Sequence, residues 1–448
     1  MHEEQSEQAT GRAEAEGLVS FIGESPSMFH TVAAARTRLE QAGYTYLPEG
    51  MPWQVEPGSR CYTVRNNSSL VAWRVGSEVD PAAYHFQLTA AHSDSPTFKL
   101  KAQPEIEGPD GYLRLDVEAY GGMMDYTWFD RPLSLAGRVM VRDGSGVASR
   151  LVTLDRDVAV IPSVAIHMNR EVNKGFAPNR STDLCPLVST GECTRGFVDA
   201  LLAEELGVEP AQIVARDLYL VNRVAPRIWG ANGEFISAPH LDDLMCVYAA
   251  LRAFAQSANE RTVSVFACFD SEEVGSATMQ GAESTFLRDT LARVNGALGA
   301  TEDDFYRALS SSMLVSCDNA HAVHPNHPEL SDAQNAPHLN GGLVIKEAAN
   351  QHYCTDGFSR AVLQAVLDDA EVPYQLFANR SDMAGGSTLG NISNTHVSVH
   401  AVDVGCAQLA MHASYETAGA HDVQLAIDAL RAFYDADIVI DGADAARW

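Results

Sequence analysis

Lysine is scarce in this chain, and basic residues as a whole are outnumbered. The 31 Lys and Arg residues face 59 Asp and Glu residues, which gives a formal net charge of −28 at pH 7. Such a surface repels the phosphates of nucleic acids and the headgroups of anionic lipids. No basic cluster offsets it, because only four lysines occur, at Lys99, Lys101, Lys174 and Lys346. We therefore expect neither nucleic acid nor a membrane as a partner.

Long apolar runs and targeting signals are also missing. No stretch approaches the roughly 20 apolar residues that a membrane-spanning helix needs. The first seven residues, MHEEQSE, are acidic and lack the basic start and apolar core of an export signal. The eight cysteines form no CxxC pair, and several lie inside apolar runs, so we predict reduced core residues. These features together predict a cytoplasmic protein.

The chain is long and apolar enough for a large core. It has 448 residues, of which 46% are hydrophobic, and this predicts two to three domains or one domain with an insertion. Strands alternate with helices in 1–95 and again in 236–448, which predicts an α/β catalytic domain with a doubly wound mixed sheet. Residues 96–235 have short alternating strands with many Gly and Pro residues, so we predict an inserted β-rich domain there.

Several individual elements can be placed from periodicity and turn residues. We predict two helices within 12–42, the second starting near Thr31, and a hairpin over 61–75 that turns at Asn66 and Asn67. Further strands are predicted at 84–91, 261–268, 313–316 and 374–378, and further helices after Asp243 and at 280–294, 355–370 and 421–434.

Two adjacent glutamates, Glu272 and Glu273, follow the buried strand predicted at 261–268. Open α/β sheets place their ligands at this carboxyl edge. Neighbouring residues on extended backbone point in opposite directions, so one carboxylate could hold a cation while the other faces a water. An ordinary acidic turn is the alternative interpretation.

Other acids and histidines also stand where predicted strands end or helices begin. His92 is followed two residues later by Asp94, which suits a metal ligand and the carboxylate that orients it. Asp318 and His412 occupy comparable positions. Each has a structural alternative, such as a hydrogen-bonded loop histidine.

Asp242 completes this group but cannot be separated from Asp243 by spacing alone. Both can be first-turn acids that the helix dipole favours. A pair of divalent cations about 3.5 to 4 Å apart needs a bridging carboxylate, terminal carboxylates and imidazoles, and a bound water. The sequence supplies these types at His92, Asp242, Glu273, Asp318 and His412, which leaves Glu272 to accept a proton from the water.

These residues lie in motifs that extend over nearly the whole chain. The motifs are AHSDSP at 91–96, YGG at 120–122, WFDRPL at 128–133, Ile161-Pro162 to His167, Leu241-Asp242, DSEEVGS at 270–276, QGA at 280–282, DNAHAVHPN at 318–326, NRSDM at 379–383, GSTLG at 386–390 and LAMH at 409–412. The sequence resembles the aspartyl aminopeptidase family, zinc metallopeptidases that remove acidic residues from peptide N-termini.

The resemblance implies two Zn²⁺ ions per subunit, with Co²⁺ or Mn²⁺ as alternatives. Asp242 would bridge them, His92 and Asp318 would hold one, and Glu273 and His412 would hold the other. Glu272 would be the general base toward the metal-bound water, and Asp94 would orient His92.

The resemblance also implies an assembly. The insert would be a dimerisation domain, and dimers would build a tetrahedral shell of twelve subunits in which His167 reaches a neighbour's active site. Taken by itself, His167 alternates with apolar residues and could be a core or interface histidine. We expect His321 to line the substrate pocket.

Some positions depart from the family pattern. Arg and Asn usually flank the Leu-Asp pair, where this chain has His240 and Asp243, and the usual Ser-Ile-Arg-Glu after the last histidine is Ala-Ser-Tyr-Glu at 413–416. Some members carry a lysine for the acidic side chain of the substrate where this chain has Asn350. A desolvated carboxylate needs a cationic or multiply donating partner. The candidates for that partner are Lys346, His352 and Arg380.

The sequence therefore predicts a metal-dependent aminopeptidase that acts on free peptide N-termini, with Asp or Glu as the expected first residue. A broad-specificity aminopeptidase and another dinuclear zinc amidohydrolase or deacylase are the enzymatic alternatives. A noncatalytic shell or cargo-binding protein of the same fold is the alternative from another class. Retention of all five ligand types together with Glu272 argues against it.

Overall fold

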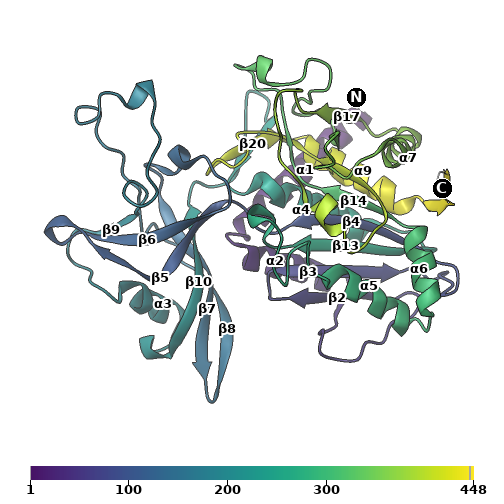
Figure 1. The fold of residues 1–448 in the computed structure, drawn as a ribbon, viewed down its shortest axis with the longest axis horizontal. Coiled ribbons are helices and arrows are strands. Elements are labelled where there is room, and N and C mark those ends of the chain that lie inside the picture. The colour runs from purple at the N-terminus through teal and green to yellow at the C-terminus, as the bar shows by residue number, and fades with distance from the viewer. Residues whose placement is uncertain (1, 443–444) are drawn as a thin grey trace.

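A nine-stranded mixed sheet forms the centre of the larger part of the molecule (Figure 1). The structure is a computed structural model that describes residues 2–442 and 445–448. The four central strands, β13, β4, β14 and β18, run parallel to one another. In spatial order the strands are β1 (Thr45–Tyr46), β2 (Arg60–Arg65), β3 (Ser69–Val75), β13 (Val263–Phe269), β4 (Phe86–His92), β14 (Met313–Cys317), β18 (His400–Gly405), β16 (Leu343–Glu347) and β17 (Tyr374–Ala378).

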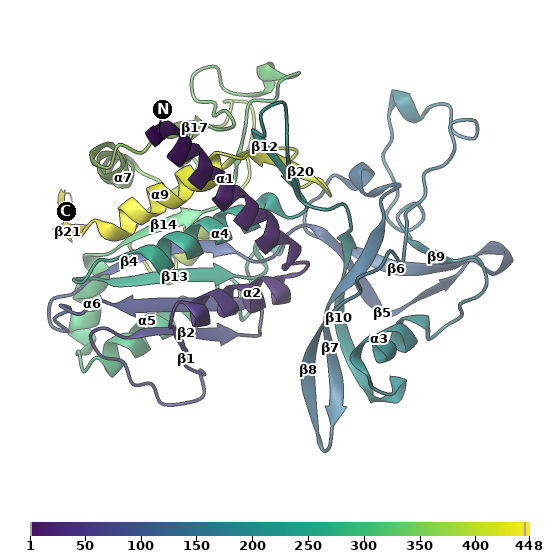
Figure 2. The ribbon, with the colours of Figure 1, turned by 180° about the vertical axis from the view of Figure 1, so that it is seen from behind.

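Helices cover both faces of this sheet, as the two opposite views in Figures 1 and 2 show. One face carries α1 (His2–Gly23), α2 (Met28–Gln41), α4 (Leu241–Gln256), α7 (Gly357–Asp369) and α9 (Asp422–Asp435). The other carries α5 (Phe286–Ala297), α6 (Glu302–Ser310) and α8 (Leu389–Ser393). Strand β13 is buried throughout because Val265 packs into one core and Phe266 into the other. The two covered faces explain its uninterrupted apolar sequence.

A second sheet with its own core stands beside the first (Figures 1 and 2). Its six strands follow the order β8 (Gly146–Thr153), β7 (Leu133–Asp143), β10 (Ile213–Asn222), β5 (Thr97–Glu107), β6 (Leu113–Tyr120) and β9 (Leu187–Ser189), and all their pairings are antiparallel. Helix α3 (Phe197–Leu206) packs against it. All these elements lie inside the predicted insert at 96–235.

In a third sheet, strands near the end of the predicted insert at 96–235 pair with strands from the C-terminal half of the chain. Its order is β11 (Arg227–Trp229), β12 (Phe235–Ala238), β20 (Glu416–Gly419), β19 (Ala407–Leu409) and β15 (Ala320–His321). Strand β11 thus pairs with β12 and not with the six-stranded sheet. The remaining short elements are β21 (Val439–Asp441), β22 (Ala445–Arg447), η1 (Pro109–Gly111), η2 (Asp125–Trp128), η3 (Val172–Lys174), η4 (Pro210–Gln212), η5 (Glu272–Val274) and η6 (Pro328–Leu330).

The predicted α/β class with a mixed sheet is confirmed, and most predicted elements are present. The hairpin turns at Asn66 and Asn67, whose φ angles are 55° and 56°. The helix predicted at 280–294 lies further along, at Phe286–Ala297, and α3 and α6 were not predicted. Within the described ranges, every helix is too short or too polar to cross a bilayer.

Candidate metal centre

The five predicted ligands come from distant parts of the chain and meet at the carboxyl edge of the nine-stranded sheet. His92 ends β4, Asp242 begins α4, Glu273 lies in η5, Asp318 follows β14, and His412 lies between β19 and β20. The Nε2 atom of His92 is 3.6 Å from Asp242 Oδ1, and that of His412 is 3.5 Å from Asp242 Oδ2. The same atom of His412 is 3.5 Å from Glu273 Oε2. Each carboxylate oxygen of Asp242 therefore faces a different histidine.

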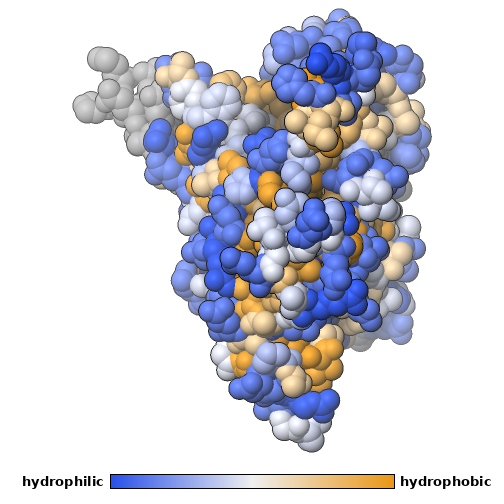
Figure 3. Space-filling model, turned by 90° about the vertical axis from the view of Figure 1, so that its left-hand side faces the viewer, coloured by the Kyte–Doolittle hydropathy of each residue, from blue (hydrophilic) through white to orange (hydrophobic). Residues whose placement is uncertain are grey.

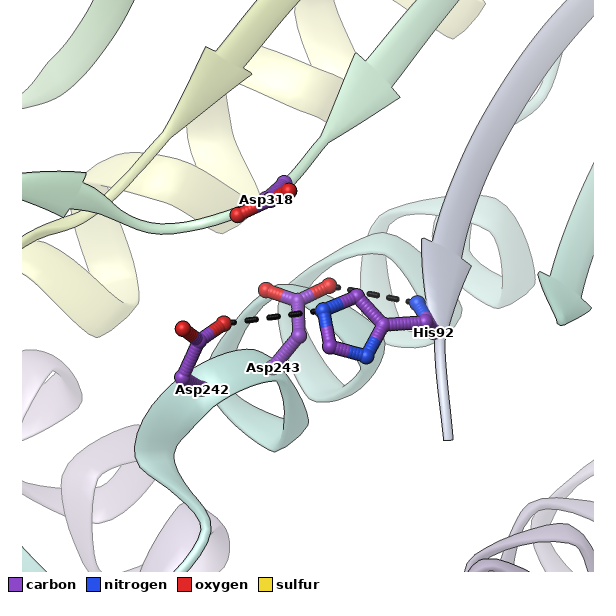
Figure 4. A group of neighbouring side chains, drawn as sticks. All are labelled: His92, Asp242, Asp243 and Asp318. Atoms are coloured by element: carbon purple, nitrogen blue, oxygen red, sulfur yellow. Dashed lines mark hydrogen bonds and ion pairs between the residues drawn. The ribbon is translucent and has the colours of Figure 1, made fainter. Parts of the chain in front are cut away.

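These contacts form two groups that share Asp242. In the first, drawn in Figure 4, one possible ligand atom from each residue lies within 4.8 Å of the others; its members are His92, Asp242, Asp243 and Asp318. The second group, defined in the same way, holds Asp242, Glu273 and His412. A carboxylate common to two adjacent groups is the arrangement that a bridging ligand requires.

The ring of His92 is held so that Nε2 points into the first group. Its Nδ1 lies 3.0 Å from the carbonyl oxygen of Asp94 and 3.4 Å from Oδ1 of the same residue. A carbonyl only accepts hydrogen bonds, so Nδ1 carries the proton and Nε2 keeps its lone pair. Asp94 thus occupies the orienting position predicted for it, and it uses its main chain as well as its carboxylate.

The prediction that Glu272 and Glu273 lie on extended backbone is wrong. They do not continue an extended strand, because Ser271 adopts φ 68° and Glu272–Val274 form a 3-10 turn. The amide of Glu272 donates to Asp94 Oδ1 and that of Glu273 to Asp94 Oδ2, each at 3.2 Å. The turn brings both carboxylates to His92, since one ligand atom from each of the three residues lies within 4.8 Å of the others.

The centre contains more negative charge than its surroundings can stabilise. Burial raises the pKa of Glu273 well above its usual range and that of Glu272 to about 8, and neighbouring carboxylates add to both shifts. Asp242 differs, because the neighbouring His412 and His92 overcome the effect of its burial and lower its pKa. Three buried carboxylate oxygens of this centre have no hydrogen-bond partner among the described residues, namely Asp242 Oδ1, Asp243 Oδ1 and Glu273 Oε1. Unpaired buried oxygens beside imidazole nitrogens fit divalent cations such as zinc.

Two buried acids near the ligands were not predicted to take part. Asp243 is fully buried, and its Oδ2 accepts a hydrogen bond from the amide of His92 at 3.2 Å, so it is more than a first-turn acid. Glu416 is 2% exposed and accepts from the amides of Asp242 at 3.0 Å and His412 at 2.7 Å. It thereby ties two ligand-bearing segments together. The sequence signal that could have identified Glu416 was its position as an acidic residue at the start of the buried strand β20.

The substrate-binding role predicted for Lys346 needs correction. The side chain is 2% exposed, and its ammonium donates to the carbonyls of Asp318 at 2.7 Å and Asn319 at 3.3 Å. It also lies 3.6 Å from Asp318 Oδ1. Lys346 is thus enclosed behind Asp318 and its ammonium is not free for a substrate carboxylate.

The other predicted substrate-binding residues lie in different settings. Arg380 pairs with Asp382 and donates to the carbonyl of Glu329. His321 ends β15, three residues after Asp318, and its side chain is exposed. His167 is exposed in the loop between β8 and β9. A groove of about 1000 Å³ lies elsewhere, between α7 and α9, and none of the predicted site residues lines it.

Comparison with known proteins assigns the family. A model of the family described as aminopeptidase I zinc metalloprotease (M18) matches residues 21–434. The chain belongs to the M18 family. The M18 assignment confirms the resemblance seen in the sequence motifs and makes the chain a zinc metalloaminopeptidase.

M18 relatives match over almost their whole length. A probable M18 family aminopeptidase 2 from Clostridium acetobutylicum is 41% identical over 426 residues, which is 94% of this chain and 98% of the relative. One from Pseudomonas aeruginosa PAO1 is 41% identical over 424 residues, with 94% and 97% covered.

Solved M18 structures share the fold. One chain in the cryo-EM structure of the Ape4 and Nbr1 complex is 35% identical with a TM-score of 0.92, covering 95% of this chain and 86% of that one. The S. cerevisiae mApe1 dodecamer is 26% identical with a TM-score of 0.82, covering 94% and 96%.

Proposed function

We propose that this M18 protein removes the N-terminal residue of peptides at a centre of two zinc ions per subunit. The observation that carries the proposal is Asp242, whose two oxygens face different histidines and which belongs to both groups of possible ligands. His92 and Asp318 would hold one ion with Asp242, and Glu273 and His412 would hold the other. Co²⁺ and Mn²⁺ suit the same nitrogen and oxygen donors.

Zinc, when bound, supplies a Lewis acid for the peptide carbonyl and makes water more acidic. The protein's part is to move protons and to hold groups in place. Glu272 carries the spare carboxylate next to His92, and a carboxylate held in this way is a common proton-transfer group. We assign it to accept the proton of the attacking water and to deliver it to the leaving amine. Asp94 keeps His92 in position.

The preferred first residue of the peptide is the finer part of the proposal. An acidic preference follows the family resemblance and would need a cation near the bound side chain. Lys346 is enclosed against Asp318, and Arg380 is paired with Asp382. Because both cations already have acidic partners, a second candidate is favoured, a broad-specificity aminopeptidase with the same centre.

A substrate panel with metal analysis tests these assignments. Amides and short peptides that begin with Asp, Glu, Leu or Arg, and acetylated versions of each, are assayed with zinc, cobalt or manganese. Preference for Asp and Glu supports the acidic candidate, and similar rates on all free N-termini support the broad one. Cleavage of only the acetylated compounds, or fewer than two metals per chain at full activity, contradicts the proposal.

Glu272→Gln separates proton transfer from metal binding. The amide keeps the shape of the side chain but cannot accept the proton, so we expect kcat to fall by about 10² to 10⁴ with metal content unchanged. Mass spectrometry of bound metal and steady-state kinetics measure the two effects. An unchanged kcat would reassign the base.

We further propose that the protein is a homo-oligomer whose inserts form dimers that assemble into a tetrahedral dodecamer. The yeast mApe1 relative is a dodecamer. Apolar side chains are scattered over the outward face of the insert (Figure 3), and several are strongly exposed, including Val147 at 57%, Val164 at 58% and Met168 at 83%. Of these, Val164 and Met168 lie in one exposed loop together with Ile166 at 47%, and large apolar side chains that gather in this way mark surfaces that another subunit can cover. His167 lies in the same exposed loop as Met168 and would reach a neighbour's site.

A cytoplasmic location is part of the proposal. All eight cysteines are free thiols in the structure, and six of them are buried. Free thiols of this kind are usual in a reducing compartment.

A further inference from the structure

The hydroxyl of Tyr120 connects the insert to the metal centre of its own subunit. Tyr120 is the last residue of β6, in the six-stranded sheet. Its hydroxyl donates to Asp94 Oδ2 at 2.8 Å and lies 3.4 Å from Asp270 Oδ1. Asp94 is 1% exposed and Asp270 is 4% exposed. The tyrosine is therefore a hydrogen-bond donor placed between two buried carboxylates that otherwise repel each other.

Asp94 is the point through which this contact would act. Its carboxylate accepts from the amides of Glu272 and Glu273, and its Oδ1 lies 3.4 Å from Nδ1 of His92. One carboxylate thus fixes a ligand from β4 together with the turn that carries a second ligand and the proposed base. A shift of Asp94 would move all three at once.

The residues that follow Tyr120 lie against the second group of ligands. A Cβ atom at Gly121 would be 3.1 Å from Glu273 Cβ, and Gly121 has φ 83°, so glycine permits the close approach. The amide of Met124 donates to the carbonyl of His412 at 3.0 Å. The segment 120–124 of the insert therefore touches both groups of ligands.

We propose that Tyr120 is a positioning residue that holds Asp94, and through it His92 and the Glu272-Glu273 turn, in the geometry that binds metal. The inference rests on the proposed two-metal centre. Removal of the hydroxyl leaves Asp94 facing Asp270 without the shared donor, so Asp94 moves and the ligands it holds are misplaced. Loss of a hydrogen-bond partner that orients metal ligands typically lowers metal affinity or activity by about 10- to 100-fold.

The test compares Tyr120→Phe with Tyr219→Phe. Tyr219 is a matched control, because its ring packs edge-on against Tyr120 with centroids 5.5 Å apart and the described residues give its hydroxyl no carboxylate partner. Zinc affinity is measured by competition with a chelator, the ligand field by the absorption spectrum of the Co²⁺ form, and kcat and KM separately. We expect Tyr120→Phe to weaken zinc binding about 10- to 100-fold, alter the Co²⁺ spectrum and lower kcat more than KM changes. Tyr219→Phe should match the parent in all four.

A double-mutant cycle with Asp94→Asn shows whether the effect passes through Asp94. If it does, the double variant should bind zinc about as weakly as Asp94→Asn alone, because the two changes remove one interaction. This comparison holds even if Tyr120→Phe also lowers thermal stability. Additive losses, or a Tyr120→Phe protein with the zinc affinity and Co²⁺ spectrum of the parent, would overturn the inference. A parent protein that binds fewer than two metals would instead contradict the proposed function, so the two failures are distinguishable.

Discussion

The buried lysine behind Asp318 gives a prediction that can be worked out from its contacts. In Lys346→Met the apolar stem is kept and the ammonium is lost. The carbonyls of Asp318 and Asn319 then lose their donor, and the Asp318 carboxylate loses the positive charge 3.6 Å away. Removal of one partner of a buried ion pair typically costs about 3 to 5 kcal/mol of unfolding free energy. We expect a loss of this size when a chelator has removed metal.

Bound zinc should reduce that loss. The proposed ion beside Asp318 supplies positive charge to the same carboxylate, so the variant in excess zinc should recover part of the difference. Urea unfolding of chelated and zinc-saturated protein, followed by circular dichroism, measures both values. The matched control is Lys99→Met, which removes an ammonium that pairs with Asp217 at 2.9 Å with both side chains partly exposed. Its cost should be about 0 to 1 kcal/mol, with no dependence on zinc.

The reasoning fails if Lys346→Met and Lys99→Met lose similar amounts. It also fails if zinc leaves the Lys346→Met loss unchanged, because the proposed ion would then not share the carboxylate with the ammonium.

Two further predictions concern other parts of the molecule. His30, which bonds Ser27 and Thr153 where α2 meets β8, has its pKa lowered to about 4 by burial. Between pH 6.5 and 4 the unfolded chain binds a proton that the folded protein does not, so the stability of the folded protein falls as the pH falls. In urea unfolding from pH 7.5 to 5, the parent should lose about 2 kcal/mol more than His30→Gln. Equal dependence of the unfolding free energy on pH in the two proteins would refute this. His167→Phe should lower kcat with metal content intact, and mixing it with Glu272→Gln subunits should restore about a quarter of the sites if His167 acts on a neighbour. Absence of complementation after subunit exchange would exclude that role.

The sequence pattern predicted that the five proposed ligands would meet at one edge of the sheet, but it left out the neighbouring acids Asp243 and Glu416. His92 and Asp318 stand at the ends of apolar, β-branched runs, and parallel strands bring such ends to one edge of a sheet. The position of the site could therefore be predicted from the hydrophobic pattern of single strands, which needs no information on contacts between distant residues. The family resemblance then indicated Asp242, rather than Asp243, as the proposed bridging residue.

The remaining features depend on contacts between residues far apart in sequence. Ser271 adopts the αL conformation, which turns Glu272 and Glu273 toward the same cluster. The hydrogen bonds that the amides of these two glutamates donate to Asp94, about 180 positions earlier, stabilise this turn. Lys346 was a candidate partner for the acidic side chain of the substrate, and only the packing of β16 beside β18 and β14 places it behind Asp318. Periodicity carries no information on such pairings.

The spread of the proposed zinc ligands along the chain has a consequence for protein synthesis. The first is residue 92 and the last is residue 412 of 448. Because a chain emerges from the ribosome from its N-terminus onward, His412 appears after the other four proposed ligands. A nascent or truncated subunit therefore lacks a complete centre and cannot cleave the peptides around it. Cleavage at the proposed centre therefore starts only after the last of these ligands has been made.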